Sequence, residues 1–235
     1  FKSENKIPGL YSIQLDDEGE RSFTYWRSDS AARQVMKHIN EKITETLSQG
    51  DMFFFSGISL AVITPEDRDK FWLFVSKLKR AGVTLVFDPN YRARLWDNAE
   101  QAKTQFEQAF KYSDILLPGV DDFEQLYGLK TSEDVFSFCK PYEFEELVIK
   151  NGEKGIFCYS GEQVYHFNID PVKNVVDTTS AGDSFNGVYL GARAKGLNFS
   201  HSVESASKAA GLVIQHRGAI VNSKVYADFV AQQFG

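Results

Sequence analysis

Residues 175–196 read VVDTTSAGDSFNGVYLGARAKG, and they lead from an apolar pair into a segment that we expect to be helical over 181–195. Between Val176 and this helix no residue has a bulky side chain. Small residues let an anion come close to the unpaired backbone N–H groups at a helix N-terminus. The stretch therefore predicts that an oxyanion or a phosphate binds where the helix begins.

Asp183 lies in the first turn of this predicted helix, beside the expected anion hole of Ser180, Ala181 and Gly182. A carboxylate there can accept the proton of an attacking hydroxyl, while the N–H groups stabilise charge on a transferring phosphoryl group. A simpler interpretation is a capping box formed by Ser180 and Asp183. Gly182 favours the phosphate site, because glycine is a poor choice inside a purely structural helix.

The rest of the chain alternates short apolar runs with helical patterns. Predicted β segments are the hairpin 9–27 with its turn at 16–19, the run 51–60 as a strand and the loop after it, and 83–88, 114–118, 146–150, 155–160 and 163–168. Predicted helices are 30–48, 64–80 with Thr64 as N-cap, a segment after the strand 83–88 that ends near 112, and 121–128, 132–140, 181–195 and 200–215. This alternation predicts an α/β fold with a mostly parallel sheet covered on both faces.

Polar residues follow several of the predicted strands. Ser56-Gly57 follows FFF, residues 88–92 (DPNYR) follow VTLVF, Lys150-Asn151-Gly152 follows LVI, and Asp177 follows a valine pair. In an open α/β sheet, ligands bind beyond the carboxyl ends of the strands. We therefore expect these segments to form the site together with the helix start at 181.

Composition narrows the class of protein. The 235 residues include 43% hydrophobic and 25% charged residues, with a formal net charge of -6, which is typical of a soluble globular protein. The acidic balance and the lack of a dense Lys/Arg cluster argue against nucleic acid as a partner. Without an apolar run long enough to span a bilayer, we expect no membrane partner. The two cysteines, Cys139 and Cys158, predict idle thiols and a cytoplasmic location.

The segment DTTSAGDSF at 177–185 resembles the C-terminal signature of the ribokinase-like (PfkB) carbohydrate kinases, DTTGAGDSF, with Ser180 in place of glycine. The resemblance implies a ribokinase-like three-layer αβα sandwich with a small β lid. It implies an ATP-dependent kinase in which Asp183 is the catalytic base and Ser180, Ala181 and Gly182 are the anion hole. No GxxxxGK[ST] motif occurs, so the use of ATP follows from this resemblance.

Four further segments, PGLYSIQLDDEGERSFTYWR, SGISLAVITPEDR, FDPNYRARLW and IQHRGAI, resemble the branch of this family that phosphorylates 2-keto-3-deoxygluconate. The resemblance implies transfer of the γ-phosphate to its 6-hydroxyl. Implied substrate-binding residues are Tyr11, Tyr25, Arg27, Arg92 and Asp183. A planar guanidinium suits the carboxylate of a keto acid. Packing or dimer contacts for the hairpin residues, and a surface ion pair for Arg92, are the alternatives.

The resemblance also implies a nucleotide site and its cations. Implied ATP-binding residues are Asn90, Arg92, Lys150, Asn151, Gly152 and Gly182. Mg²⁺ is implied as a cofactor with Asp122 in its outer shell, although LPGVDD has Gly119 where many relatives have Asn. K⁺ is implied as a monovalent cation near Asp177. A tight turn at 150–152, and a simple turn role for Asn90, remain the alternatives.

The resemblance implies residues 1–28 as part of the β lid and residues 29–235 as a Rossmann-like αβα kinase domain. Relatives carry more residues before this point, and we expect the N-terminal strands of the fold to be absent from this chain. We also expect a homo-oligomer formed through the lid. Alternative functions are a fructokinase or other sugar kinase of the family, and a non-catalytic sugar or nucleotide sensor on the same fold.

Overall fold

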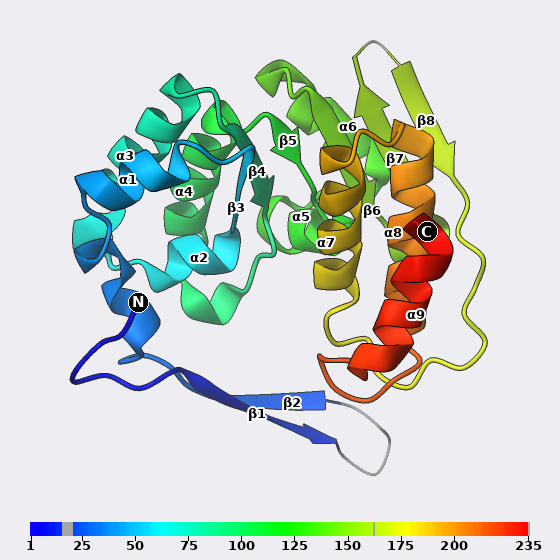
Figure 1. Ribbon diagram of the computed structural model, residues 1–235, viewed down its shortest axis with the longest axis horizontal. Helices are drawn as coiled ribbons and strands as arrows, with labels where there is room; N and C mark the ends of the chain where they lie inside the picture. Colours follow the sequence, from blue (N-terminus) through cyan, green and yellow to red (C-terminus); the bar gives the residue numbers. More distant parts are fainter. Residues whose placement is uncertain (16–20, 162, 235) are drawn as a thin grey trace. The chain divides into compact units, whose positions relative to one another are not determined.

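The computed structural model describes residues 1–15, 21–161 and 163–234. Its contacts divide the chain into two compact parts, Phe1–Glu146 and Leu147–Gly235. Each part contains β-strands covered by helices (Figure 1). The predicted division into a lid, 1–28, and a kinase domain stays a prediction.

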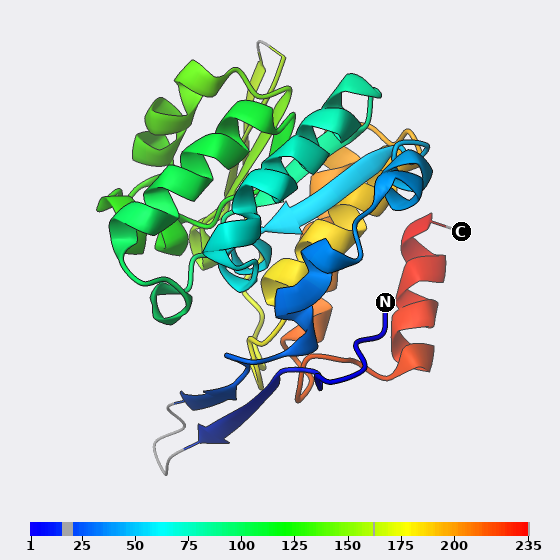
Figure 2. The same cartoon turned by 90° about the vertical axis from the view of Figure 1, so that its left-hand side faces the viewer.

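The first part opens with the predicted hairpin. Strands β1 (Leu10–Leu15) and β2 (Arg21–Trp26) pair antiparallel, with Tyr11 opposite Tyr25 and Leu10 opposite Trp26. They form a two-stranded sheet of their own, seen as a ribbon in Figure 2. The turn that we predicted at 16–19 lies outside the described residues.

Three parallel strands form the sheet of the first part. They are β3 (Met52–Ser56), β4 (Thr84–Asp88) and β5 (Ile115–Leu116), with β4 between the other two. The register places Ser56 beside Asp88, so two of the predicted polar strand ends are neighbours. Aromatic rings from β3, β4 and α4 (Ala99–Tyr112) fill the core, and Phe87 contacts Phe106 edge to face at 5.3 Å. These strands confirm the predicted mostly parallel pairing.

The remaining helices of the first part are labelled in Figure 1. They are α1 (Glu41–Leu47), α2 (Gly57–Val62), α3 (Arg68–Arg80), α5 (Val120–Tyr127) and α6 (Ser132–Cys139), with short 3-10 helices at Ala31–Lys37, Pro65–Asp67, Ala93–Leu95 and Lys140–Tyr142. Both α3 and α4 pack on β4. Each of these two helices buries one face, because its apolar residues recur with the helical period from which the helix was predicted.

Three predictions in this part were wrong in detail. The helix predicted over 64–80 is a short 3-10 helix at Pro65–Asp67 followed by α3, and the Thr64 side chain makes no capping hydrogen bond. Residues 30–48 form a 3-10 helix and a separate α1, because the Asn40 side chain accepts the Ile43 N–H at 3.0 Å and begins a new helix. The loop predicted after FFF is the helix α2. A capping box between Ser56 and Ser59 begins it, and serine at both positions is a weaker signal than the usual Ser/Glu pair.

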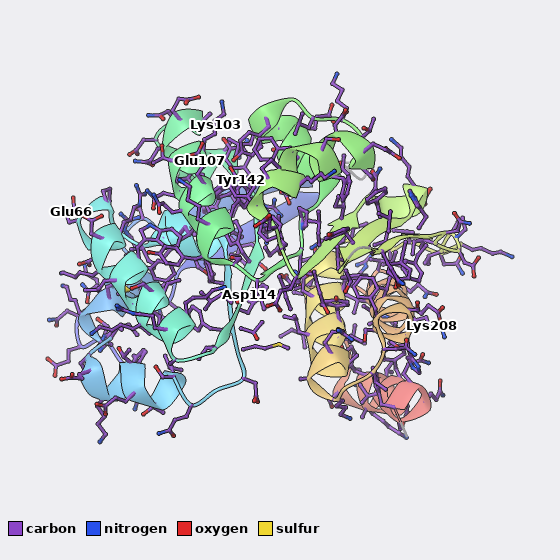
Figure 3. All side chains as sticks on the ribbon, turned by 90° about the horizontal axis from the view of Figure 1, so that it is seen from above. Glu66, Lys103, Glu107, Asp114, Tyr142 and Lys208 are labelled. Atoms are coloured by element: carbon purple, nitrogen blue, oxygen red, sulfur yellow. The ribbon has the colours of Figure 1, made fainter. Side chains whose placement is uncertain are left out.

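Asp114, labelled in Figure 3, joins three segments of the first part. Its N–H donates to Leu85 O and its Oδ2 accepts the Leu85 N–H, both at 2.8 Å, while its carbonyl accepts the Glu145 N–H at 2.8 Å. Its other carboxylate oxygen pairs with Lys79 at the end of α3. The partly buried Asp114 carboxylate thus aligns β4 with the segment that leads into β5.

All but the first residue of β6 (Glu146–Lys150) belongs to the second part. This part also contains β7 (Ile156–Ser160) and β8 (Gln163–Phe167), followed by α7 (Ala181–Ala194) and α8 (Phe199–Val213). Strands β7 and β8, both of which were predicted, pair antiparallel. Helices α7 and α8 are joined by four residues and lie side by side in Figures 1 and 2. Tyr189 and Val203 are fully buried on these two helices.

Two features of the second part differ from the sequence prediction. A third helix, α9 (Ser223–Phe234), follows α8; none of its residues is buried, so it lacks the strong apolar face that predicts a helix. The valine pair before Asp177 is not a strand. Val176 and Asp177 instead donate their N–H groups to Ile214 O, at 2.8 and 3.1 Å, and both valines are exposed.

Within the described residues, no helix is long and apolar enough to cross a membrane.

Candidate active site

The loop before α7 is held by Asp177. Its Oδ1 accepts the Thr179 N–H at 2.9 Å and its Oδ2 accepts the Gly218 N–H at 3.0 Å. Together with the bonds to Ile214 O, these contacts tie the loop to the segment after α8. Asp177 therefore acts first on the shape of the loop, and its predicted place near a monovalent cation stays a prediction.

Ser180 is the last residue before α7, and its backbone is left-handed, with φ 61° and ψ 15°. This conformation costs a non-glycine residue about 1–2 kcal/mol, which explains why glycine is the more common residue in the motif that the segment resembles. The Ser180 side chain makes no capping hydrogen bond. The capping-box alternative is therefore wrong.

The first turn of α7 is open. A Cβ atom added at Gly182 would meet nothing within 4 Å. Ala181 N–H donates to Thr178 O at 3.3 Å, whereas the N–H groups of Gly182 and Asp183 have no acceptor among the described residues. Of the predicted anion hole, the Ala181 donor is therefore already used and the Gly182 donor is unpaired, as is that of the neighbouring Asp183. The role of Ser180, Ala181 and Gly182 as an anion hole stays a prediction.

The Asp183 side chain is exposed at this open turn, with no hydrogen-bond partner among the described residues. An exposed carboxylate beside unpaired N–H groups can take a proton from a hydroxyl while those groups hold an anion. The geometry of the first turn therefore suits the chemistry predicted for it.

Lys150 ends β6, and its ammonium is directed to α7. Its Nζ donates to Asn186 Oδ1 at 2.9 Å, and Asn186 is only 2% exposed. Asn186 lies three residues after Asp183, so this bond joins the end of β6 to the helix that carries the predicted base. Sequence reasoning missed Asn186. A polar residue on the apolar face of a predicted helix was the available signal.

The segment after Lys150 forms a tight turn, as the alternative interpretation held. Asn151 N–H donates to Gly155 O at 3.0 Å, around a short 3-10 helix at Gly152–Lys154. Gly155 has φ 99°, and a Cβ there would lie 2.5 Å from Phe167 O, so only glycine fits. The nucleotide role of Lys150, Asn151 and Gly152 is compatible with this turn and stays a prediction.

In the first part, the segment after β4 carries Asn90 and Arg92. Asn90 has φ 33°, and its Oδ1 is buried without a hydrogen-bond partner among the described residues. Buried polar atoms are nearly always paired, and an unpaired one at a strand end points to a bound ligand or water. Left-handed backbone at a non-glycine residue is likewise common at functional sites.

Arg92 and Asp122 lie close together. Asp122 Oδ1 accepts the Tyr91 N–H at 2.8 Å and lies 3.5 Å from Arg92 Nη1, which also donates to Tyr91 O at 2.8 Å. The surface ion pair that we kept as an alternative for Arg92 is therefore present. About half of the Arg92 side chain remains exposed, so the guanidinium keeps donors available to a ligand.

Gly57 at the start of α2 determines how closely this segment approaches. A Cβ at Gly57 would lie 1.9 Å from Pro89 O and 2.6 Å from Phe106 Cζ. The glycine of the SGISLA motif thus allows the segment that leads to Asn90 to pack on α2. The sequence marked this glycine by its place after a strand and by the resemblance of its segment to the family, but neither signal predicted this close contact.

The hairpin forms a second group of predicted residues. The rings of Tyr11 and Tyr25 are 6.3 Å apart, and Arg27 Cζ lies 4.2 Å from the centre of the Tyr25 ring. Arg27 Nε is buried without a hydrogen-bond partner among the described residues. A buried guanidinium N–H that lacks an acceptor is suited to an anionic ligand. Gly9 makes room, since a Cβ there would lie 2.8 Å from Arg27 Cβ.

Comparisons with known proteins identify the family of the chain. The family described as pfkB family carbohydrate kinase matches residues 2–225. The 2-dehydro-3-deoxygluconokinase of Haemophilus influenzae is 37% identical over 238 residues, covering 100% of this chain and 75% of that protein.

Two solved structures share the fold. The 2-dehydro-3-deoxygluconokinase of Thermotoga maritima has a TM-score of 0.75 at 24% identity, covering 91% of this chain and 69% of that one. The ribokinase of Arabidopsis thaliana, complexed with ribose and ATP, has a TM-score of 0.74 at 21% identity, covering 96% and 70%. These similarities confirm the predicted ribokinase-like α/β fold.

Proposed function

Because the chain belongs to the pfkB family of carbohydrate kinases, we propose that it transfers the γ-phosphate of ATP to the 6-hydroxyl of 2-keto-3-deoxy-D-gluconate. The product is 2-keto-3-deoxy-6-phosphogluconate, with ADP as the second product. The observation that carries the proposal is the first turn of α7, where an exposed Asp183 lies beside two backbone N–H groups without acceptors.

In this reaction the Asp183 carboxylate accepts the proton of the 6-hydroxyl. The hydroxyl oxygen bonds to the γ-phosphorus, and the bond from that phosphorus to the bridging oxygen of ADP breaks. The N–H groups of Gly182 and Asp183 hold the transferring phosphoryl group, and a fixed dipole at a helix N-terminus suits developing negative charge.

The acidic end of the substrate is assigned to the arginines. Arg27 has a buried Nε without an acceptor among the described residues, and Arg92 retains an exposed guanidinium. A carboxylate accepts paired N–H bonds from a guanidinium, and a neutral sugar has no equivalent group. Tyr11 and Tyr25 add apolar walls with hydroxyl groups at their tips. This chemistry favours a keto acid over fructose or ribose.

ATP is assigned to Asn90, Arg92, Lys150, Asn151, Gly152 and Gly182. Mg²⁺ accompanies ATP in this proposal and neutralises charge on its phosphates when bound. Asp122 is assigned to an outer-shell place, because a carboxylate at a strand end, which here accepts the Tyr91 N–H, is a group that would bind a magnesium-bound water. K⁺ near Asp177 is part of the same proposal.

We also propose that the hairpin joins two copies of the chain and that the protein is cytoplasmic. Leu10 and Trp26 are paired across the hairpin and are 61% and 58% exposed, which is unusual for large apolar side chains. Cys139 and Cys158 are buried and form no disulfide within the described residues, which suits a reducing compartment.

The test is ADP release from ATP by the full-length protein, with 2-keto-3-deoxygluconate, fructose and ribose offered in parallel. We expect turnover with the keto acid, and its loss in Asp183→Ala. A preference for fructose would refute the role of the arginines in binding a carboxylate, but it would leave the kinase activity supported. Sugar binding without turnover of any of the three would replace the kinase by a sensor.

A further inference from the structure

The contact between Lys150 and Asn186 has no part in the reaction described so far. Lys150 Nζ donates to Asn186 Oδ1 at 2.9 Å, and both residues belong to the second compact part. Lys150 is half-buried at the end of β6, while Asn186 is buried on α7, one turn beyond Asp183. The bond therefore fixes a cation to the helix that carries the predicted base.

An amide is a costly choice at this buried position. Asparagine is a poorer helix former than leucine or alanine, and a buried amide is unfavourable unless it is hydrogen-bonded. The adjoining buried positions of α7 are apolar, with Phe185 before Asn186 and Val188 after Gly187. Packing alone would be better served by an apolar residue at 186, so the amide has another use.

The chemistry of the acceptor indicates that use. A neutral amide oxygen orients an ammonium group through a hydrogen bond without cancelling its charge, whereas a carboxylate would neutralise it. A lysine that must attract phosphate needs both a fixed direction and a full positive charge. Asn186 supplies the first, and as a neutral acceptor it does not itself reduce the second.

We propose that Asn186 is a positioning residue for the nucleotide: it directs the Lys150 ammonium toward the polyphosphate of ATP and couples the end of β6 to the start of α7. The inference rests on the proposed function, since it takes Lys150 as a nucleotide-binding residue. Asn186 itself does not touch the substrates. Its effect is specific to the polyphosphate and does not extend to the sugar acid.

The experiment compares Asn186→Asp with the unchanged full-length protein. The substitution keeps the shape of the side chain and places a carboxylate against the ammonium. We expect the Kd of ATP, measured by titration calorimetry without sugar, and the KM of ATP to rise about tenfold, or about 1.4 kcal/mol. The KM of the keto acid should stay within about twofold, because its binding groups are elsewhere.

Four further variants test whether the effect is merely structural. Lys150→Met should weaken ATP binding by itself, and Asn186→Asp in the Lys150→Met background should weaken it little further, because the two act as a pair. Ser202→Ala removes a buried hydroxyl of α8 that donates to Asn198 O at 2.9 Å, and should leave the Kd of ATP unchanged. Asn186→Leu tests loss of the bond without added charge, and it too should raise the Kd of ATP.

The outcomes separate the two levels of the proposal. If the unchanged protein shows no turnover of any sugar, the proposed function fails. If it phosphorylates the keto acid and folded Asn186→Asp binds ATP as tightly as before, the positioning role of Asn186 is overturned alone. Equal losses of ATP and keto-acid affinity would also overturn it, since they would indicate a general disturbance of α7.

Discussion

Gly57→Ala should destabilise the protein strongly although it adds a single methyl group. The new Cβ would lie 1.9 Å from Pro89 O, whereas carbon and oxygen atoms normally remain about 3.3 Å or more apart. It would also lie 2.6 Å from Phe106 Cζ, inside a packed core. Overpacking costs about 1–3 kcal/mol, and we expect the upper end because the nearest atom is backbone.

Thermal unfolding is the assay. About 3 kcal/mol lowers the Tm of a domain of this size by roughly 6–12 °C. Gly191→Ala on α7 is the matched control, since its Cβ would meet nothing within 4 Å and the residue is helical. That change should raise stability by up to about 1 kcal/mol.

The clash at Pro89 should also affect the candidate active site. Pro89 precedes Asn90, so movement of this segment should raise the KM of the substrates in Gly57→Ala while Gly191→Ala keeps it. A Tm for Gly57→Ala within about 2 °C of the unchanged protein would refute the argument that α2 and the segment after β4 depend on this close approach.

Four further predictions follow from the described residues. Asp183→Asn should lower kcat by about 100-fold to 10,000-fold with the Kd of ATP nearly unchanged, as steady-state kinetics with calorimetry would measure; a kcat near that of the unchanged protein would remove Asp183 as the base. Arg27→Gln should raise the KM of the keto acid about tenfold or more, because a charged hydrogen bond is lost, and equal effects on neutral sugars would contradict the assignment. Ser180→Val should lower the free energy of unfolding by about 2 kcal/mol and lower kcat, because a β-branched residue is unfavourable in left-handed backbone. Ser180→Gly should retain both stability and activity, and an equal Tm for the two variants would argue against strain at this position. Burial raises the pKa of the Cys139 thiol, so its reactive thiolate is disfavoured up to strongly alkaline pH, and the buried Cys158 is equally inaccessible; an aromatic disulfide reagent should label both thiols only after unfolding, and rapid labelling of the native protein would contradict this.

Local patterns in the sequence predicted most elements correctly. The apolar runs before Asp88 and Lys150 are strands, and the hairpin pairs as expected. The errors arose where local signals were weak or misleading: Asn40 divides a predicted helix, Ser56 begins an unpredicted one, and α9 has no buried face. The apolar pattern of a segment does not show whether a side chain will cap the backbone and so begin or end a helix within it.

The site shows the same division. The motif at 177–185 predicted the base and the helix start, and the structure places Asp183 exposed beside unpaired N–H groups. The alternative of a capping box depended on the backbone angles of Ser180, which the sequence does not state. The ion pair of Arg92 with Asp122 joins residues 30 positions apart, so no local pattern could predict it.

The sequence by itself determined the family, the alternation of strands and helices and the identity of the chemical groups, because these depend on residue type and on spacing within one segment. Only the tertiary structure decided that Gly57 meets Pro89, that Asp177 holds Gly218 and that Lys150 reaches Asn186. Those contacts join distant segments, and their distances follow from how whole elements pack. Packing is a cooperative property of the core, and it is expressed in no single stretch of residues.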